Sequence, residues 1–263
     1  MTLVRSEPGP VWRITLSRPE ARNAVSVPML EDLARALGDA AAEPDARVVI
    51  LAGDGPDFCA GADLAELEGA SSGAAGLDYG RELEEVLRGI GEHPLPVIGE
   101  IRGGALGAGC QIAVACDLAV AATDARLGIP SARLGVVIGY ENVERLVHAV
   151  GPKRAAEILV AGRTLSGEEA VAWGLVNEAV PPEELSGRAA ELAEGIAAAA
   201  PLSVRSSKRG IRAVLAKLSL DREAEGFRVA DFDMMAAQAL ASHDLREGIR
   251  AFRERRDPQF RGS

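Results

Sequence analysis

The stretch that decides the fold is PVIGEIRGGALGAGCQIAVACDLAVAA, residues 96–122. Its first residues, 96–101, are mostly apolar and predict a strand. A glycine-rich turn is predicted over 103–109, followed by a helix of small residues and a second apolar strand over 117–122. Because strand and helix patterns alternate over so short a distance, this stretch indicates an α/β fold.

The preceding residues repeat this alternation. Residues 11–16 alternate apolar and polar side chains with a period of two and predict a strand, and Pro28 suits the start of a helix. The apolar face of that helix would consist of Leu30, Leu33, Ala34 and Leu37. Val48–Ala52 is an unbroken apolar run ending at Gly53, which predicts a strand buried on both faces. A charged helix is predicted over 78–92.

The later part of the chain is mostly helical in pattern, beginning near Gly139. Ser166-Gly-Glu-Glu169 has the residues of a capping box, which predicts the start of a helix. Beyond Pro201 the sequence carries only helix signals. The predicted organisation is therefore an α/β core over residues 1–200 and a helical C-terminal region over residues 201–263.

Composition excludes several classes of protein. The chain of 263 residues is 48% hydrophobic and 26% charged, which is typical of a globular protein. Its net charge of −10 and its aromatic content of 3% argue against a nucleic-acid partner, because phosphate binding needs a basic face and base stacking needs aromatic side chains. No apolar run approaches the roughly 20 residues that span a bilayer, and no secretory signal opens the chain. We therefore expect a cytoplasmic protein without a membrane partner.

Three short motifs indicate no cofactor or hydrolase site. The cysteines lack the CxxC spacing of a zinc site, so we expect free thiols at Cys59, Cys110 and Cys116 and no metal. The glycine-rich turn would need glycine at position 112 to match a dinucleotide fingerprint, and Ile112 stands there. GASSG at 69–73 would make Ser71 a nucleophile, but no buried strand is predicted before it.

Two turns of small residues each precede a predicted helix: FCAGADL at 58–64 and GGALGAGCQ at 103–111. Small residues let a main chain approach a ligand closely, and the first N–H groups of a helix have no partner within it. If the two turns converge, they offer two backbone donors to one developing oxyanion. The sequence alone does not bring them together.

These turns, together with RPEARNAVS at 18–26 and IAVACD at 112–117, resemble the crotonase superfamily, the enoyl-CoA hydratase/isomerase family. The resemblance continues through 135–151, 161–181 and 244–260, so it covers nearly the whole chain. It implies a crotonase-like spiral of ββα units with a helical C-terminal region that forms a homotrimer, or a hexamer as a dimer of trimers. It also implies an acyl-CoA ligand, with coenzyme A as part of the substrate and no separate cofactor.

The resemblance also implies roles for individual residues. The backbone N–H groups of Ala62 and Ala108 would form the oxyanion hole for the thioester carbonyl. The positions that match the family's path for the CoA nucleotide and pantetheine are Ala24, Ala60, Asp63 and Leu64. Phe252 and Arg255 match positions at which relatives reach the CoA of a neighbouring subunit.

The chain departs from the family at two positions where its hydratases carry glutamates. Gln111 and Ser131 stand there instead. A glutamine amide does not transfer protons near neutral pH, and an unactivated serine hydroxyl is too weak a base. The chain therefore keeps the oxyanion donors and loses the proton-transfer groups, each of which typically supplies on the order of 10²–10⁴-fold in rate.

Three functions follow from this departure. The first is a lyase or isomerase acting on acyl-CoA, with Glu141 as acid or base, because relatives with other chemistries carry acids in this stretch. Glu141 could equally be a solvated residue that the helix dipole favours in a first turn. The second function is a non-catalytic acyl-CoA-binding protein. The third is a slow hydratase or isomerase that uses water as proton carrier. The sequence does not reveal the acyl group.

Overall fold

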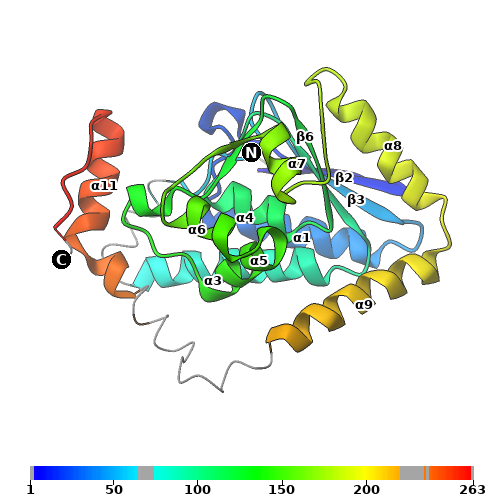
Figure 1. Ribbon diagram of the computed structural model, residues 1–263. Coiled ribbons are helices and arrows are strands. Elements are labelled where there is room, and N and C mark those ends of the chain that lie inside the picture. Colours follow the sequence, from blue (N-terminus) through cyan, green and yellow to red (C-terminus); the bar gives the residue numbers. More distant parts are fainter. Residues whose placement is uncertain (1–2, 64, 66–73, 220–233, 235–236, 262–263) are drawn as a thin grey trace.

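The computed structural model describes residues 3–63, 65, 74–219, 234 and 237–261. Leu64 and Ser71 lie outside the described residues. The described chain forms an α/β core followed by helices, as the sequence predicts (Figure 1).

The core is built on a six-stranded sheet in the order β1-β2-β3-β4-β6-β9. Strand β1 (Val4–Glu7) pairs antiparallel with β2 (Val11–Leu16), and the other neighbours pair in parallel. The remaining strands are β3 (Val48–Gly53), β4 (Val97–Ile101), β6 (Leu118–Ala122) and β9 (Glu178–Val180). This sheet confirms the strands predicted over 11–16, 48–52, 96–101 and 117–122.

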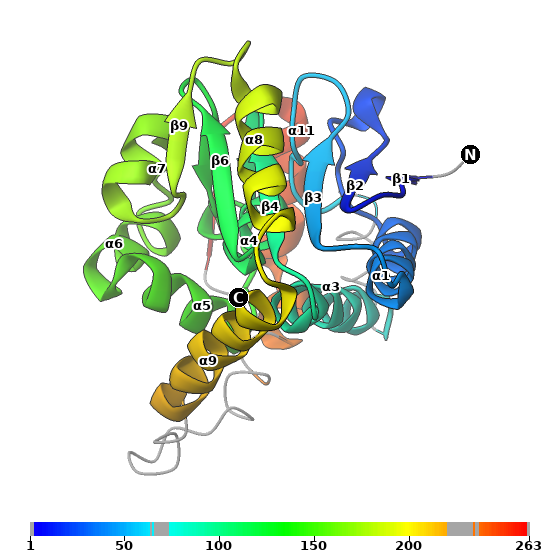
Figure 2. The same ribbon diagram turned by 90° about the vertical axis from the view of Figure 1, so that its right-hand side faces the viewer.

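Helices cover both faces of this sheet. On one face, Val48, Ile50 and Ile98 pack beneath α8 (Leu185–Ala197), which lies along the sheet in Figure 2. On the other face, Val49 and Leu51 belong to the main core with α1 (Val27–Ala42) and α3 (Ala74–Glu92). The central strand β3 is therefore buried on both faces, as its apolar run predicts.

Helix α1 corrects one predicted position. Its buried side chains are Met29, Leu30, Leu33, Ala36, Leu37 and Ala40. Ala34 is exposed, so its place on the predicted apolar face was wrong. Ala36, three residues after Leu33, lies on the buried face of the helix instead of Ala34.

A second, three-stranded sheet contains β5 (Gly104–Leu106), β7 (Arg126–Gly128) and β8 (Leu165–Ser166). The stretch predicted as a turn over 103–109 thus contains a short strand, because β5 pairs in parallel with β7. Helix α4 (Ala108–Ala115) follows β5 after one residue. Ser166 also confirms the predicted capping box at the start of α7 (Gly167–Trp173), where its Oγ accepts the Glu169 N–H at 3.2 Å.

The remaining helices are η1 (Pro19–Ala21), η2 (Ser131–Arg133), α5 (Tyr140–Val150), α6 (Pro152–Leu159), α9 (Pro201–Ser219) and α11 (His243–Glu254). None of the described helices has the length and apolar character needed to cross a membrane. Helix α11 packs on its own chain, since Leu245 and Ile249 are buried against Ala62 and Val136.

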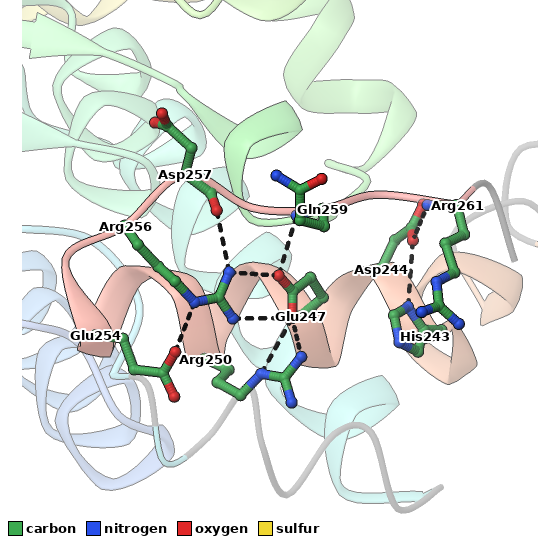
Figure 3. A network of polar contacts seen from close by, with 9 residues as sticks. All are labelled: His243, Asp244, Glu247, Arg250, Glu254, Arg256, Asp257, Gln259 and Arg261. Atoms are coloured by element: carbon green, nitrogen blue, oxygen red, sulfur yellow. Dashed lines mark hydrogen bonds and ion pairs between the residues drawn. The ribbon is translucent and has the colours of Figure 1, made fainter.

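A buried carboxylate anchors the chain end that follows α11. Glu247 is 2% exposed and accepts hydrogen bonds from Arg250, from Arg256 at 2.6 Å and from the Gln259 N–H at 3.0 Å (Figure 3). Hydrogen bonds from Arg256, Gln259 and Arg250 hold the pKa of Glu247 well below its usual range. Glu247 therefore ties residues 256–259 back along the helix.

Replacing Glu247 with glutamine should lower stability at neutral pH and flatten its dependence on acid. An unfolded glutamate takes up a proton near a pKa of about 4.3, whereas folded Glu247 stays ionised to lower pH. Its contribution to the free energy of unfolding is therefore present above this pH and is lost as the pH falls further. We expect the urea midpoint of the wild type to fall more between about pH 5 and about pH 3 than that of Glu247→Gln. Glu254→Gln, in the same helix, is the control, and equal slopes for wild type and Glu247→Gln would contradict the prediction.

Candidate active site

The first segment of the site is the loop before α1, which adopts an uncommon backbone conformation. Arg22 and Asn23 have φ angles of 52° and 54°, in the left-handed region. The fully buried Asn23 side chain donates to the carbonyl oxygens of Asp54 and Asp57, each at 2.8 Å. Its Oδ1 accepts the Arg18 N–H at 2.9 Å. Asn23 thus fastens this loop to the chain that follows β3.

The two turns of small residues lie against each other. The Cys59 N–H donates to the Gly104 carbonyl at 2.9 Å, and the Leu106 N–H donates to the Cys59 carbonyl at 3.0 Å. Farther along, a Cβ added to Gly61 would lie 3.9 Å from the backbone nitrogen of Ala108. A Cβ added to Gly107 would lie 3.7 Å from the Gly61 Cα. The turns therefore lie against each other beside Ala62 and Ala108, a contact that the sequence could not establish.

Backbone hydrogen bonds around the turns bypass these two residues. The Val25 N–H donates to Gly61 at 2.8 Å, and the Asp63 N–H donates to Val25 at 2.9 Å, on either side of Ala62. Ala108 is the first residue of α4, so its N–H has no carbonyl within the helix to reach. Across the described residues, neither N–H takes part in the backbone hydrogen bonds between these segments.

Gln111 and the segment leading to Ser131 both flank the start of α4. Gln111 lies one turn into the helix and is 7% exposed. Strand β7 pairs Gly128 with Leu106, and the Gly107 N–H donates to the Gly128 carbonyl at 2.9 Å. Gly128 therefore lies beside the turn that precedes Ala108. Ser131, three residues later, is half-buried and is the first residue of η2.

Glu141 occupies the first turn of α5 and is half-buried. Asn142 and Arg145 fasten this helix to Glu84 of α3, with the Asn142 Nδ2 at 3.1 Å from the carboxylate. Within the described residues, no hydrogen bond joins Glu141 to Gln111, to Ser131 or to either turn. The role of Glu141 as acid or base stays a prediction.

Of the residues matched to the CoA path, Ala24, Ala60 and Asp63 belong to the loop before α1 and to the first turn, which are joined by hydrogen bonds. Ala24 and Ala60 are half-buried, and the Ala60 N–H donates to the Arg22 carbonyl at 2.9 Å. Asp63 pairs with Arg18 at 2.5 Å, and it accepts the Ala65 N–H at 2.9 Å. Phe252, near the end of α11, and Arg255, directly after it, are exposed. Both residues are far from Ala24, Ala60 and Asp63 in the sequence.

Asp57 and Arg22 form a contact that sequence reasoning missed. Arg22 donates to both carboxylate oxygens of Asp57, at 2.6 and 2.9 Å, and the Gly104 N–H donates to Oδ1 at 2.6 Å. The hydrogen bond from Arg22 lowers the pKa of Asp57 below its ordinary value, and the Gly104 N–H adds to this against the opposing effect of burial. Nothing in the segment RPEARN, residues 18–23, indicates which acidic residue pairs with Arg22.

No other chemistry competes at this place. Burial raises the pKa of the free Cys59 and Cys110 thiols to about 12, so neither forms a thiolate nucleophile near neutral pH. In the part of the chain that the structure describes, no group of three His, Cys, Asp or Glu side chains could hold a metal ion.

Comparison with known proteins agrees with this geometry. The family model described as enoyl-CoA hydratase/isomerase matches residues 6–263. A putative enoyl-CoA hydratase of Thermus thermophilus is 39% identical over 260 residues, covering 98% of this chain and 100% of that protein. A methylmalonyl-CoA decarboxylase in complex with 2-nitronate-propionyl-CoA superimposes with a TM-score of 0.86 at 27% identity, covering 99% of both chains. An enoyl-CoA hydratase/isomerase from Xanthobacter autotrophicus Py2 superimposes with a TM-score of 0.85 at 30% identity, again covering 99% of both. These neighbours confirm the expected crotonase fold.

Replacing Gly109 with alanine should force the two turns apart. A Cβ at Gly109 would lie 2.2 Å from the Cys59 carbonyl oxygen, so the backbone must shift. Such overpacking typically costs about 1–3 kcal/mol of stability, measurable by urea unfolding. Gly89→Ala in α3 is the matched control, because nothing lies within 4 Å of its Cβ position, and it should stabilise by roughly 0.5–1 kcal/mol. A Gly109→Ala protein as stable as Gly89→Ala would show that the turns are not in this contact.

Proposed function

The chain belongs to the enoyl-CoA hydratase/isomerase family, and we propose that it binds and processes acyl-CoA thioesters with the N–H groups of Ala62 and Ala108 as donors to the thioester oxygen. The convergence of the two turns carries this proposal, because two donors at one point stabilise an oxyanion that develops during reaction. Each such donor typically contributes about 10²–10³-fold to kcat. Helix α4, which begins at Ala108, adds its dipole in the same sense.

The rest of the ligand would follow the edge of the turns. Ala24, Ala60 and Asp63 are the proposed contacts of the CoA nucleotide and pantetheine, with Leu64 next to them in sequence. The half-buried alanines leave main chain open to a ligand at this edge, which supports the assignment. Phe252 and Arg255 are exposed and would contact the CoA of a neighbouring copy.

Proton transfer is where this chain would differ from a hydratase. Gln111 and Ser131 flank the start of α4, and neither residue type exchanges a proton near neutral pH without activation. We assign the acid–base role, if the reaction needs one, to Glu141 in the first turn of α5. Two alternatives remain. The protein could bind acyl-CoA without catalysis, or it could act as a slow hydratase or isomerase that uses water as proton carrier.

Decarboxylation is a second candidate, favoured by two observations. The methylmalonyl-CoA decarboxylase described above shares the fold over 99% of this chain. Loss of CO₂ from an α-carboxylated thioester breaks the bond between the α-carbon and the carboxylate and leaves its electron pair on the α-carbon as a thioester enolate, which water can protonate. That reaction needs oxyanion donors and no protein base. Two glutamates at these positions would repel the carboxylate of the substrate, whereas uncharged Gln111 and Ser131 would not.

One panel tests these alternatives. Pure protein is titrated with crotonyl-CoA and with methylmalonyl-CoA, and binding, hydration and CO₂ release are measured on the same sample. We expect both thioesters to bind. CO₂ release from methylmalonyl-CoA would support decarboxylation, slow hydration of crotonyl-CoA would support the slow hydratase, and binding without turnover would support the binding protein. In Gln111→Glu/Ser131→Glu, crotonyl-CoA hydration should rise by about 10²-fold or more, whereas each single variant should do little because such groups act as a unit. Wild-type hydration at a rate typical of enzymes, about 10 s⁻¹, would contradict the proposal, as would a failure to bind either thioester.

We further propose that the protein acts in the cytoplasm as a homotrimer or a dimer of trimers. Free thiols at Cys59, Cys110 and Cys116 suit a reducing compartment. Helix α9 exposes large apolar side chains, with Leu202 80%, Ile211 64% and Val214 61% exposed. Burying them between copies would remove this apolar surface from water.

Charge at Ile211 and Val214 should block assembly. Ile211→Glu/Val214→Glu places two carboxylates where neighbouring copies would meet, so we expect light scattering to report the mass of a single chain. Val160→Glu, at an 80% exposed apolar position beyond α6, is the control and should leave the assembly unchanged. A wild-type chain that is a stable monomer at micromolar concentration would overturn the oligomer proposal.

A further inference from the structure

One carboxylate connects the three segments that meet at the proposed site. Asp57 lies at the start of the first turn, and its side chain is 8% exposed. It accepts two hydrogen bonds from Arg22 of the preceding loop and one from the Gly104 N–H at the start of the second turn. The Asp57 carbonyl also accepts from Asn23 at 2.8 Å. Asp57 therefore cross-links the loop before α1 with both converging turns.

The main chain is shaped around this carboxylate. A Cβ added to Gly104 would lie 2.9 Å from the Asp57 Oδ1 and 3.1 Å from the Arg22 guanidinium, so no larger residue fits without a shift. Arg22 takes a left-handed conformation, which is costly for a residue with a Cβ. Charge-assisted bidentate pairs fix geometry as well as adding energy. The Arg22–Asp57 pair forms although the Arg22 backbone conformation is costly. This indicates that its geometry has a role beyond packing.

The cross-link lies directly before both amide donors. Ala62 lies five positions after Asp57 along the first turn, and Ala108 lies four positions after Gly104, beyond β5. Between these points, hydrogen bonds from Cys59 and Leu106 join the two strands of main chain. A change in the Asp57–Gly104 contact would therefore propagate along this ladder to the donors.

We infer that Asp57, clamped by Arg22, is a positioning residue that sets the distance between the Ala62 and Ala108 N–H groups. This inference rests on the proposed function, because it assumes that both groups hold one thioester oxygen. Asp57 itself touches no reacting atom. Its effect would be on polarisation of the thioester rather than on affinity for CoA, since misplacing a catalytic group by about 1 Å can cost on the order of 10²-fold in rate.

The test is difference infrared spectroscopy of crotonyl-CoA carrying ¹³C at the thioester carbonyl, together with calorimetric measurement of its Kd. On the wild type, we expect the carbonyl stretch to move to lower wavenumber on binding. The shift should be largely lost in Asp57→Ala, with Kd changed less than about 3-fold and any turnover lowered about 10–100-fold. Asp57→Asn keeps an acceptor for Gly104 and should restore part of the shift. Arg22→Gln, at a half-exposed side chain, should weaken the shift even if Asp57→Ala does not fold.

Asp54→Ala is the matched control. Asp54 lies in the same loop, and its carboxylate pairs with exposed Arg5 at 3.1 Å rather than with Gly104, so its removal should leave the carbonyl shift unchanged. If the wild type shows no carbonyl shift, or does not bind the thioester, the proposed oxyanion hole fails and the inference fails with it. If the wild type shows the shift and folded Asp57→Ala or Arg22→Gln retains it fully, only the positioning role is overturned.

Discussion

The structure depends on one contact, at which the main chains of two separate turns of small residues touch. At Gly109 the start of α4 lies against the Cys59 carbonyl, at a separation that leaves no room for a Cβ. Residues 58–61 follow β3 and residues 102–107 follow β4, and these strands are parallel neighbours. Their ends therefore emerge at the same edge of the sheet, as in other open α/β sheets where ligands bind. The sheet brings the turns near each other, and the glycines allow the final approach.

Most of the fold could be predicted from the sequence because its signals are local. The period of residues 11–16, the unbroken run at 48–52 and the capping box at Ser166 each depend on neighbours a few positions away. Ala34 and β5 were not predictable in this way. The inward direction of α1 depends on which sheet it packs against, and three residues become a strand only when β7 lies beside them.

The candidate site shows the same difference between features with local sequence signals and features that depend on distant contacts. Ala62 and Ala108 could be proposed from their motifs, yet their convergence is a property of the folded chain. The pair of Arg22 and Asp57 left no signal, because thirty-five positions separate the two residues and either could have paired elsewhere. Gln111 and Ser131 could be identified from the sequence alone. Without glutamates at these two positions, a reaction of the proposed kind must take its proton carrier from Glu141 or from water, or need none.

Helix α11 gives the molecule a link between its end and its centre. Leu245 and Ile249 pack on Ala62, while Glu247 on the same helix holds the last described residues. Local opening of this helix would therefore uncover Ala62, one of the two proposed donors, and release residues 256–259 in a single event. Amide hydrogen exchange in α11 would then report how often the donor turn is bared, and a bound thioester that contacts Ala62 would slow that exchange throughout the helix.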